Sequence, residues 1–298
     1  MGNQGSILIE TDRVHYNPGD TVKGTVTIEL EKAVACSGLY LTLKGKEKTR
    51  KVEDNNSYRG SKQVRTTTTY TSTRELVDDT VCLFEVSGDG PVAPGTYTYP
   101  FSFELDSDLP SSFQHRGMRC QGSIKYKLKA EFEVNGSMTR NWRQTKEVFI
   151  FESTGLYEEH PVSENEERVI KFLGCFSRGM ATIDAKIPTN CFVGGETISV
   201  NADVIHKGNV KAIKAELVRH IRIRAERKED FHKKIIAQAT APSNQGEVLL
   251  ELSIPEELKY PSTDGEYVQV WYEVVVRGVV SWSRDPKIEL PVIVCYDK

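Results

Sequence analysis

Hydrophobic and polar residues alternate along much of this chain, which is typical of β-strands that bury one face and expose the other. The alternation is clearest at residues 21–30, 124–130 and 197–204. Turn signals rich in Gly, Asn, Asp and Pro separate such stretches, for example at residues 17–20 and 194–195. No segment has the spacing of a long amphipathic helix. The pattern therefore predicts an all-β protein made of sandwiches or barrels.

One unit of this pattern occurs twice in the chain. Residues 100–132 consist of an alternating strand, a bend that contains proline and a second alternating strand. A fainter copy, also with proline in its bend, covers residues 253–276. The turn and strand at residues 16–30 likewise match those at residues 192–206. The same order of turn, strands, bend and long strand in both halves indicates two similar β-domains.

Length and charge place the boundary between these domains. A chain of 298 residues suits two domains of about 150 residues better than one. Residues 151–170 contain six Glu and one Arg, a balance of −5, whereas the whole chain has a net charge of −3. We therefore predict an N-terminal sandwich over residues 6–152, an acidic linker over 153–170 and a C-terminal sandwich over 171–298.

The composition also excludes several classes of protein. A net charge of −3 argues against nucleic acid as a partner. The six cysteines are widely spaced without a C-x-x-C pair, which favours free thiols over a zinc site or a disulfide scaffold. We find no apolar leader and no run of about 18 apolar residues, so we expect neither a signal peptide nor a membrane span. Common catalytic motifs are missing and the six histidines are scattered, so we expect no enzyme, no metal site and no cofactor.

The first copy of the repeated unit carries a family resemblance. Its motif consists of Pro100-Phe101-Ser102-Phe103-Glu104-Leu105, then Leu109-Pro110-Ser111-Ser112-Phe113, then Gly117, then Ile124-Lys125-Tyr126-Lys127-Leu128-Lys129-Ala130. This long run resembles the α-arrestins, the arrestin-domain-containing proteins of the arrestin clan. The turn Asn17-Pro18-Gly19-Asp20 is similar to the first hairpin of that family. The resemblance covers residues 6–296 and is strongest before residue 150.

The resemblance implies both a fold and a function. The fold is the arrestin fold, with two immunoglobulin-like β-sandwich domains in tandem. The function is that of a non-catalytic adaptor that binds membrane-protein cargo for endocytosis, intracellular protein transport or signalling. Its expected partners are cytosolic segments of receptors or transporters, with ubiquitin-ligase or coat machinery, and its expected place is the cytoplasm beside the plasma membrane or endosomes. The alternative is a constitutive retromer-like coat subunit, which the Leu-Pro-Ser-Ser-Phe segment disfavours.

The chain departs from the family in one respect that concerns its partners. Many α-arrestins have a long tail with Pro-Pro-x-Tyr motifs that recruit ubiquitin ligases. This chain contains no Pro-Pro pair. We therefore expect no ligase recruitment through that motif, and the resemblance supports an arrestin core.

The N-terminus predicts a lipid attachment. Its first residues, Met1-Gly2-Asn3-Gln4-Gly5-Ser6, fit the N-myristoylation pattern M-G-x-x-x-[ST]. In that modification the acyl chain is joined to the amine of Gly2. One myristoyl chain binds a membrane only marginally, so a second attraction, such as basic residues or bound cargo, is needed. The alternative is a flexible, unmodified leader.

Three rows of cations occupy every second position, which places each row on one face of a strand. The rows are Lys44, Lys46, Lys48 and Arg50; Lys125, Lys127 and Lys129; and His220, Arg222 and Arg224. Stacked cations can hold phosphates on cargo or on lipid headgroups. The resemblance supports this role, because arrestins bind phosphorylated receptors with basic residues of the N-domain. The alternative for each row is a solvated outer face.

A threonine-rich stretch, TTTTYTST, occupies residues 66–73. Threonine favours strands, so the stretch predicts a strand beside an extended neighbour. The alternative is a cluster of regulatory phosphorylation sites.

Overall fold

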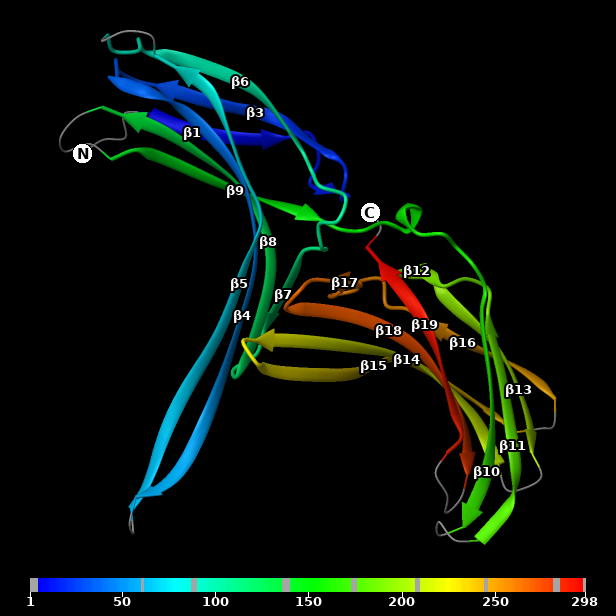
Figure 1. The fold of residues 1–298 in the computed structure, drawn as a ribbon. Helices are drawn as coiled ribbons and strands as arrows, with labels where there is room; N and C mark the ends of the chain where they lie inside the picture. Colours follow the sequence, from blue (N-terminus) through cyan, green and yellow to red (C-terminus); the bar gives the residue numbers. More distant parts are fainter. Residues whose placement is uncertain are drawn as a thin grey trace. The chain divides into compact units, whose positions relative to one another are not determined.

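The structure is a computed structural model (Figure 1). It describes residues 5–59, 62–86, 90–135, 140–172, 176–206, 210–243, 246–280 and 285–296. Gly2, the predicted lipidation position, lies outside these residues. Helical structure in the described ranges is limited to one 3₁₀ turn, Thr154–Leu156. None of those ranges contains a helix with the length and hydropathy of a membrane span.

The chain forms two compact units. The first consists of Met1–Phe151 together with Ile223–Glu229 and Gly265–Val268. The second consists of Glu152–Arg222, Asp230–Asp264 and Gln269–Lys298. Each unit contains two sheets, which confirms the predicted pair of β-sandwiches.

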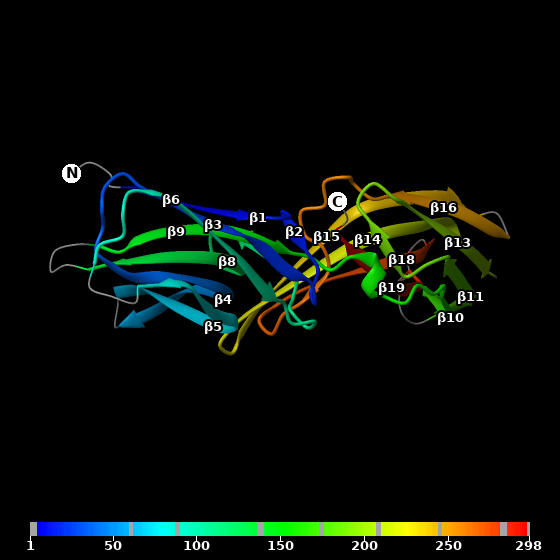
Figure 2. The ribbon, with the colours of Figure 1, turned by 90° about the horizontal axis from the view of Figure 1, so that it is seen from above.

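The first unit pairs a small sheet with a larger one. The small sheet has the order β1-β3-β6, with bounds β1 Gly5–Thr11, β3 Thr21–Leu30 and β6 Gly95–Glu104. The larger sheet has the order β2-β9-β8-β4-β5, with bounds β2 His15–Tyr16, β9 Trp142–Ile150, β8 Cys120–Val134, β4 Cys36–Arg59 and β5 Lys62–Glu85. A short strand, β7 Phe113–Arg116, pairs with β8. Figure 2 labels strands of both sheets.

The second unit repeats this arrangement. One sheet has the order β10-β11-β13-β16, with bounds β10 Val162–Phe172, β11 Phe176–Ile187, β13 Thr197–His206 and β16 Glu247–Ser253. The other has the order β12-β19-β18-β14-β15, with bounds β12 Cys191–Val193, β19 Lys287–Cys295, β18 Val268–Val280, β14 Val210–Ala225 and β15 Lys228–Pro242. The short strand β17, Thr263–Asp264, pairs with β18.

Alternating residues of each strand build the cores. In β3, Val22, Val26 and Ile28 are at most 2% exposed, whereas Lys23 and Glu29 are exposed. Burying a side chain of this size stabilises the folded state by about 1.5–3 kcal/mol. The period-2 pattern therefore predicted correctly which face of this strand packs inward.

The predicted repeat of the first turn is present at the level of single hydrogen bonds. The backbone N–H of Asp20 donates to the carbonyl of Asn17 at 3.1 Å, and that of Glu196 donates to the carbonyl of Val193 at 3.3 Å. Between them, Gly19 and Gly195 adopt φ angles of +83° and +89°, in the left-handed region that favours glycine. The same backbone bend thus precedes β3 in the first unit and β13 in the second.

The two proline bends are also fastened in the same way. Ser112 donates its N–H to the carbonyl of Ile150 at 2.7 Å and accepts the N–H of Ile150 on its hydroxyl at 3.0 Å. Ser262 makes the same two bonds to Val294, at 2.7 and 3.0 Å. These reciprocal bonds attach each bend to the neighbouring strand, β9 or β19.

A buried tyrosine completes each bend. The hydroxyl of Tyr126 donates to the carbonyl of Pro110 at 2.7 Å, and the hydroxyl of Tyr272 donates to the carbonyl of Tyr260. Both tyrosines are at most 1% exposed, so each hydroxyl requires such a partner. The proline of the second bend, Pro261, therefore follows the accepting residue, whereas Pro110 is itself the acceptor.

Candidate functional site

The first two predicted rows of cations lie on one face of one sheet. Lys44 lies directly opposite Lys127, and Lys46 lies opposite Lys125, in the antiparallel pair β4–β8. Because residues opposite one another in such a pair point to the same face, the two rows form a single basic surface of the first unit.

Carboxylates on this surface already pair with several of the cations. Lys44 contacts Asp78 at 2.8 Å and Lys46 contacts Glu75 at 3.1 Å, both across to β5. The hydrogen bond that Lys44 donates to Asp78 raises the pKa of Lys44. On β8 the pairs are Lys125 with Glu147 at 3.3 Å and Lys129 with Glu131 at 3.6 Å. These neighbours reduce the attraction of the four lysines for an external phosphate.

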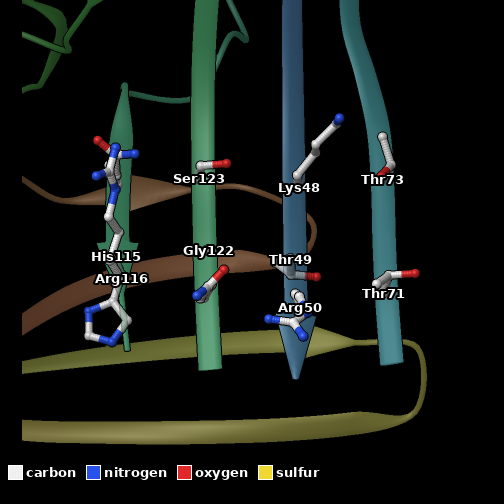
Figure 3. A pocket seen from close by; sticks show the side chains of 11 residues that line it. Lys48, Thr49, Arg50, Thr71, Thr73, His115, Arg116, Gly122 and Ser123 are labelled. Atoms are coloured by element: carbon white, nitrogen blue, oxygen red, sulfur yellow. The ribbon is translucent and has the colours of Figure 1, made fainter. Parts of the chain in front are cut away.

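Lys48 and Arg50, at the end of the first row, differ from these lysines. Neither makes an ion pair with any residue in the part of the chain that the structure describes. Both line an open cavity of about 530 Å³ (Figure 3). Its lining includes no Asp or Glu. The positive charge of these two side chains is therefore available to a ligand.

Four strands supply the cavity, in two levels of side chains. One level consists of Gln114, Ser123, Lys48 and Thr73, which are successive partners across β7, β8, β4 and β5. The other consists of Arg116, Gln121, Arg50 and Thr71, which pair in the same order. In Figure 3, Lys48 and Thr73 lie above Arg50 and Thr71. The cavity is thus open and shallow. Its floor is a lattice of polar side chains, the two levels named above, on the exposed face of one sheet.

The lattice presents hydrogen-bond donors with positive charge. Lys48, Arg50 and Arg116 contribute three cations, and the hydroxyl and amide side chains add neutral donors. The amide oxygen of Gln114, in the orientation that satisfies its neighbours, accepts from Arg116 at 2.9 and 3.0 Å and from Lys125 at 3.2 Å. The two bonds from Arg116 hold its guanidinium beside Gln114, over the lattice. Such a surface matches the charge and acceptor oxygens of a phosphate group.

The opposite face of β4 is anchored by polar bonds within the first unit. Glu47 is fully buried and accepts the backbone N–H groups of Glu266, Tyr267 and Val268 at 3.2, 2.8 and 2.7 Å. Burial raises the pKa of this carboxyl, and the three hydrogen bonds act against that increase. Thr49 donates its hydroxyl to the carbonyl of residue 224 at 2.6 Å. These bonds fix the alternate residues of β4, so Lys48 and Arg50 must point outward.

The remaining predicted cations do not line the cavity. Arg224 lies 3.4 Å from the carboxylate of Glu266 and donates to its carbonyl at 3.3 Å. Arg222, in the second unit, makes no ion pair within the described ranges, and the same is true of the exposed Lys127 on β8. The cavity is therefore lined by two of the nine predicted cations and by one cation that the rows did not include.

Sequence analysis missed that third cation, Arg116. It lies on β7, which has only four residues, too few for alternation to be recognised. The available signal was that two polar residues with a spacing of two, Gln114 and Arg116, follow the buried Phe113. Two of the three cavity threonines, Thr71 and Thr73, fall within the stretch for which phosphorylation was the alternative prediction.

Comparison with known proteins adds the family. Residues 6–151 match the model described as the N-terminal domain of arrestin (or S-antigen), and residues 177–296 match its C-terminal domain. Arrestin domain-containing protein A of Dictyostelium discoideum is 22% identical over 98% of this chain and 51% of its own length. Arrestin domain-containing protein 4 of Homo sapiens is 27% identical over 63% of this chain and 45% of its own length. The chain thus spans about half the length of the curated relatives it matches.

Proposed function

Because this chain belongs to the arrestin family, as an arrestin-domain-containing protein (α-arrestin), we propose that its cationic cavity binds phosphate on a cytosolic segment of a membrane protein. Arrestin-family proteins are non-catalytic adaptors, and this chain is one of them. The observation that carries the proposal is the pair Lys48 and Arg50, which line a carboxylate-free cavity while Lys44 and Lys46 of the same row are neutralised.

The chemistry of the cavity favours phosphate over a plain carboxylate. A phosphate monoester carries close to two charges at neutral pH and three acceptor oxygens. The lattice offers three cations beside hydroxyl and amide donors, so several oxygens can be bound together. The charge-assisted bonds would contribute about 1.5–3 kcal/mol each.

A pair of matched variants tests this proposal. Lys48→Gln/Arg50→Gln and Lys44→Gln/Lys46→Gln each remove two charges from the same strand, but only the first pair lines the cavity. The probe is an array of phosphoserine and phosphothreonine peptides with their unphosphorylated twins. We expect the first variant to bind phosphopeptides at least about tenfold more weakly than the unmodified protein, and the second to stay within about threefold.

Two results would contradict the proposal. One is equal binding of the phosphorylated and unphosphorylated twins. The other is an equal loss in both variants, which would indicate general electrostatic attraction by the surface. Vesicles that contain phosphoinositides serve as a further arm, and a preference for them over every phosphopeptide would assign the cavity to lipid.

We propose that two interactions hold this adaptor at membranes. The first is the bound cargo, and the second is a myristoyl chain at Gly2, which alone would bind only marginally. Joined in one molecule, the two raise the effective concentration of the cavity near its target. Labelling with a clickable myristate should mark the unmodified protein and not Gly2→Ala, and equal labelling of both would exclude the lipid.

The cellular role within this proposal is to direct the bound membrane protein into endocytosis or intracellular transport. Proximity labelling in the native cell tests it with the same variants. Receptors or transporters should be labelled around the unmodified protein and around Lys44→Gln/Lys46→Gln, and depleted around Lys48→Gln/Arg50→Gln. If the same proteins are labelled around Lys48→Gln/Arg50→Gln as around the unmodified protein, the cavity does not select the cargo.

A further inference from the structure

The pairing of β4 with β5 shows a regular change along the cation row. Each cation of the row lies directly opposite one residue of β5: Lys44 opposite Asp78, Lys46 opposite Glu75, Lys48 opposite Thr73 and Arg50 opposite Thr71. The first two cations thus face acids, and the last two face threonines. Threonine is a residue that becomes a dianion when it is phosphorylated.

We propose that Thr71 and Thr73 are phosphorylation sites, and that their phosphates bind the cationic cavity of the same molecule. Phosphates at these positions would extend the cross-strand ion pairs of Lys44 and Lys46 to Lys48 and Arg50. This inference rests on the anion-binding role proposed above for the cavity.

The geometry allows this contact without a change of backbone. Thr71 and Thr73 are exposed and line the cavity, level with Arg50 and Lys48 (Figure 3). Side chains directly opposite in an antiparallel pair have Cβ atoms about 4.5–5.5 Å apart. A phosphate on the threonine hydroxyl therefore reaches the ammonium or guanidinium group of its partner with the bond lengths of an ion pair.

The reaction is an ordinary phosphoryl transfer by a protein kinase that uses a nucleoside triphosphate. The hydroxyl oxygen attacks the terminal phosphorus, the bond from that phosphorus to the bridging oxygen breaks, and the nucleoside diphosphate leaves. The hydroxyl proton is released to a base and then to solvent. β5 is the last strand in the order of its sheet. Besides its pairing with β4, the enzyme would have to displace Glu226, whose carboxylate accepts the N–H of Thr71 at 3.1 Å and whose N–H donates to the hydroxyl of Ser72 at 2.8 Å.

Other threonines of the same stretch have the opposite surroundings. Thr67 lies opposite Asp54 and donates its hydroxyl to that carboxylate at 2.9 Å. Hydrogen bonds from Arg65 and Thr67 lower the pKa of Asp54, which keeps it ionised at neutral pH. Thr68 lies opposite Glu53. A phosphate at position 67 would compete with Asp54 for Arg65 and Arg119, which contact that carboxylate at 2.7 and 3.4 Å. One at position 68 would compete with Glu53 for Lys228, at 2.9 Å from Glu53. Thr71 and Thr73 instead lie opposite cations without an acidic partner in the described ranges, which distinguishes them within the stretch.

The consequence is a self-occupied cavity. A phosphate that is covalently attached beside Lys48 or Arg50 competes with a phosphate on a partner at a high effective concentration. Phosphorylation at these positions would therefore weaken partner binding, and a phosphatase would restore it.

Phosphothreonine encoded at single positions tests the inference. Three proteins are compared, with phosphothreonine at position 73, at position 71 and, as the matched control, at position 67. The second pKa of a phosphate is about 6, and ³¹P NMR titration measures it at each site. We expect pKa values about one unit or more below that of an unfolded phosphothreonine peptide at positions 71 and 73, and a smaller decrease or none at position 67, where Asp54 offsets Arg65 and Arg119.

The Lys48→Gln variant sharpens the titration. It should return the second pKa of the phosphate at position 73 toward that of the unfolded peptide. The pKa of the phosphate at position 67 should stay unchanged. A phosphate at position 73 that titrates like the peptide, or like position 67, would overturn self-occupation. Phosphosite mapping of the protein from its own cells, under phosphatase inhibition, tests the modification: phosphate at 71 or 73 supports it, and complete absence at both overturns it.

Failure of this inference is distinguishable from failure of the proposed function. Phosphopeptide affinity should fall at least tenfold when phosphate is present at position 73. If the unmodified protein binds phosphopeptides through Lys48 and Arg50 but the encoded phosphate titrates normally, only self-occupation is wrong. If the encoded phosphate shows the shift but no phosphopeptide binds, the partner-binding role is wrong and the internal site remains.

Discussion

The bends of the two units share their bonds but differ in length. In the first unit, 14 positions separate the bend serine, Ser112, from the buried tyrosine, Tyr126. In the second unit, only 10 separate Ser262 from Tyr272. Part of the added length in the first unit lies in the short strand of the bend: β7 has four residues, whereas β17 has two. The bonds that close the sheet recur, whereas the segment between them varies and, in the first unit, supplies Arg116 to the cavity.

The two units also differ in how they treat charge at one equivalent position. Five residues after each buried tyrosine stand Glu131 in the first unit and Arg277 in the second. Glu131 pairs with Arg143 at 2.7 Å, and its side chain is 23% exposed. Arg277 pairs with Glu216, whose side chain is 3% exposed. The first unit thus keeps its ion pair near solvent, whereas the second buries the acidic partner.

The largest expected effect comes from breaking the buried pair. Arg277→Met should lower the free energy of unfolding by about 3 kcal/mol, because Glu216 stays buried with Lys214 as its remaining partner. Arg143→Met should cost much less, because Glu131 can turn to water. Urea unfolding of both variants measures the difference. Equal losses would show that burial does not separate the two pairs.

The bend tyrosines should contribute equally in the two units. Tyr126→Phe and Tyr272→Phe each remove a buried hydroxyl and leave a backbone carbonyl, of Pro110 or Tyr260, without its bond. Each should destabilise its unit by about 2 kcal/mol, because a buried acceptor that loses its donor keeps its desolvation cost. Thermal and urea unfolding provide the measurement. A neutral result in one unit alone would show that the two bends are not equivalent.

The bend serines give a smaller test of the same equivalence. Ser112→Ala and Ser262→Ala remove the hydroxyl that accepts the N–H of Ile150 or of Val294, and keep the backbone bond. A loss of about 1 kcal/mol is expected for each. Amide hydrogen exchange at residues 150 and 294 should become faster in the respective variant. If the exchange rate of either amide does not change, the backbone hydrogen bond alone holds that bend to its strand.

The ion pair of Glu131 with Arg143 in the first unit should have the smallest effect on stability, and this effect should depend on pH. Hydrogen bonds from Arg143 and Asn141 lower the pKa of Glu131 from 4.5 to about 2. A depressed pKa in the folded state means that the stabilisation is complete above pH 4.5 and is lost as the pH falls toward 2. Its size should stay below about 1 kcal/mol, because the pair is exposed. The stability difference between the unmodified protein and Glu131→Gln should therefore vanish near pH 2, and a difference that persists there would contradict this origin.

The alternating rows show how far sequence patterns reach. Lys44, Lys46, Lys48 and Arg50 do share one face, since side chains of a strand alternate by geometry alone. Which of them are neutralised was not predictable, because Asp78 and Glu75 lie about 30 residues further along the chain and meet the row only through strand pairing.

The register of that pairing depends on a local irregularity. Gly45 lies opposite Val77 but Lys46 lies opposite Glu75, so β5 contains one extra residue at this point. Without that bulge, Lys48 would lie opposite Arg74 instead of Thr73. A one-residue shift moves every side chain of a strand to the other face. The bulge therefore decides that threonines, and not a like charge, complete the cavity.

By itself the sequence determined the all-β class, the duplicated bend and turn, the strand faces and the family resemblance. These properties depend on local rules: the period of two along a strand, the conformations open to glycine at residues 19 and 195, and a contiguous motif. Only the tertiary structure decided which cations remain without an acidic neighbour and which strands join into one cavity. Ion pairing and cavity formation depend on residues far apart in the chain, and only strand order, register and a single bulge bring these residues within contact distance.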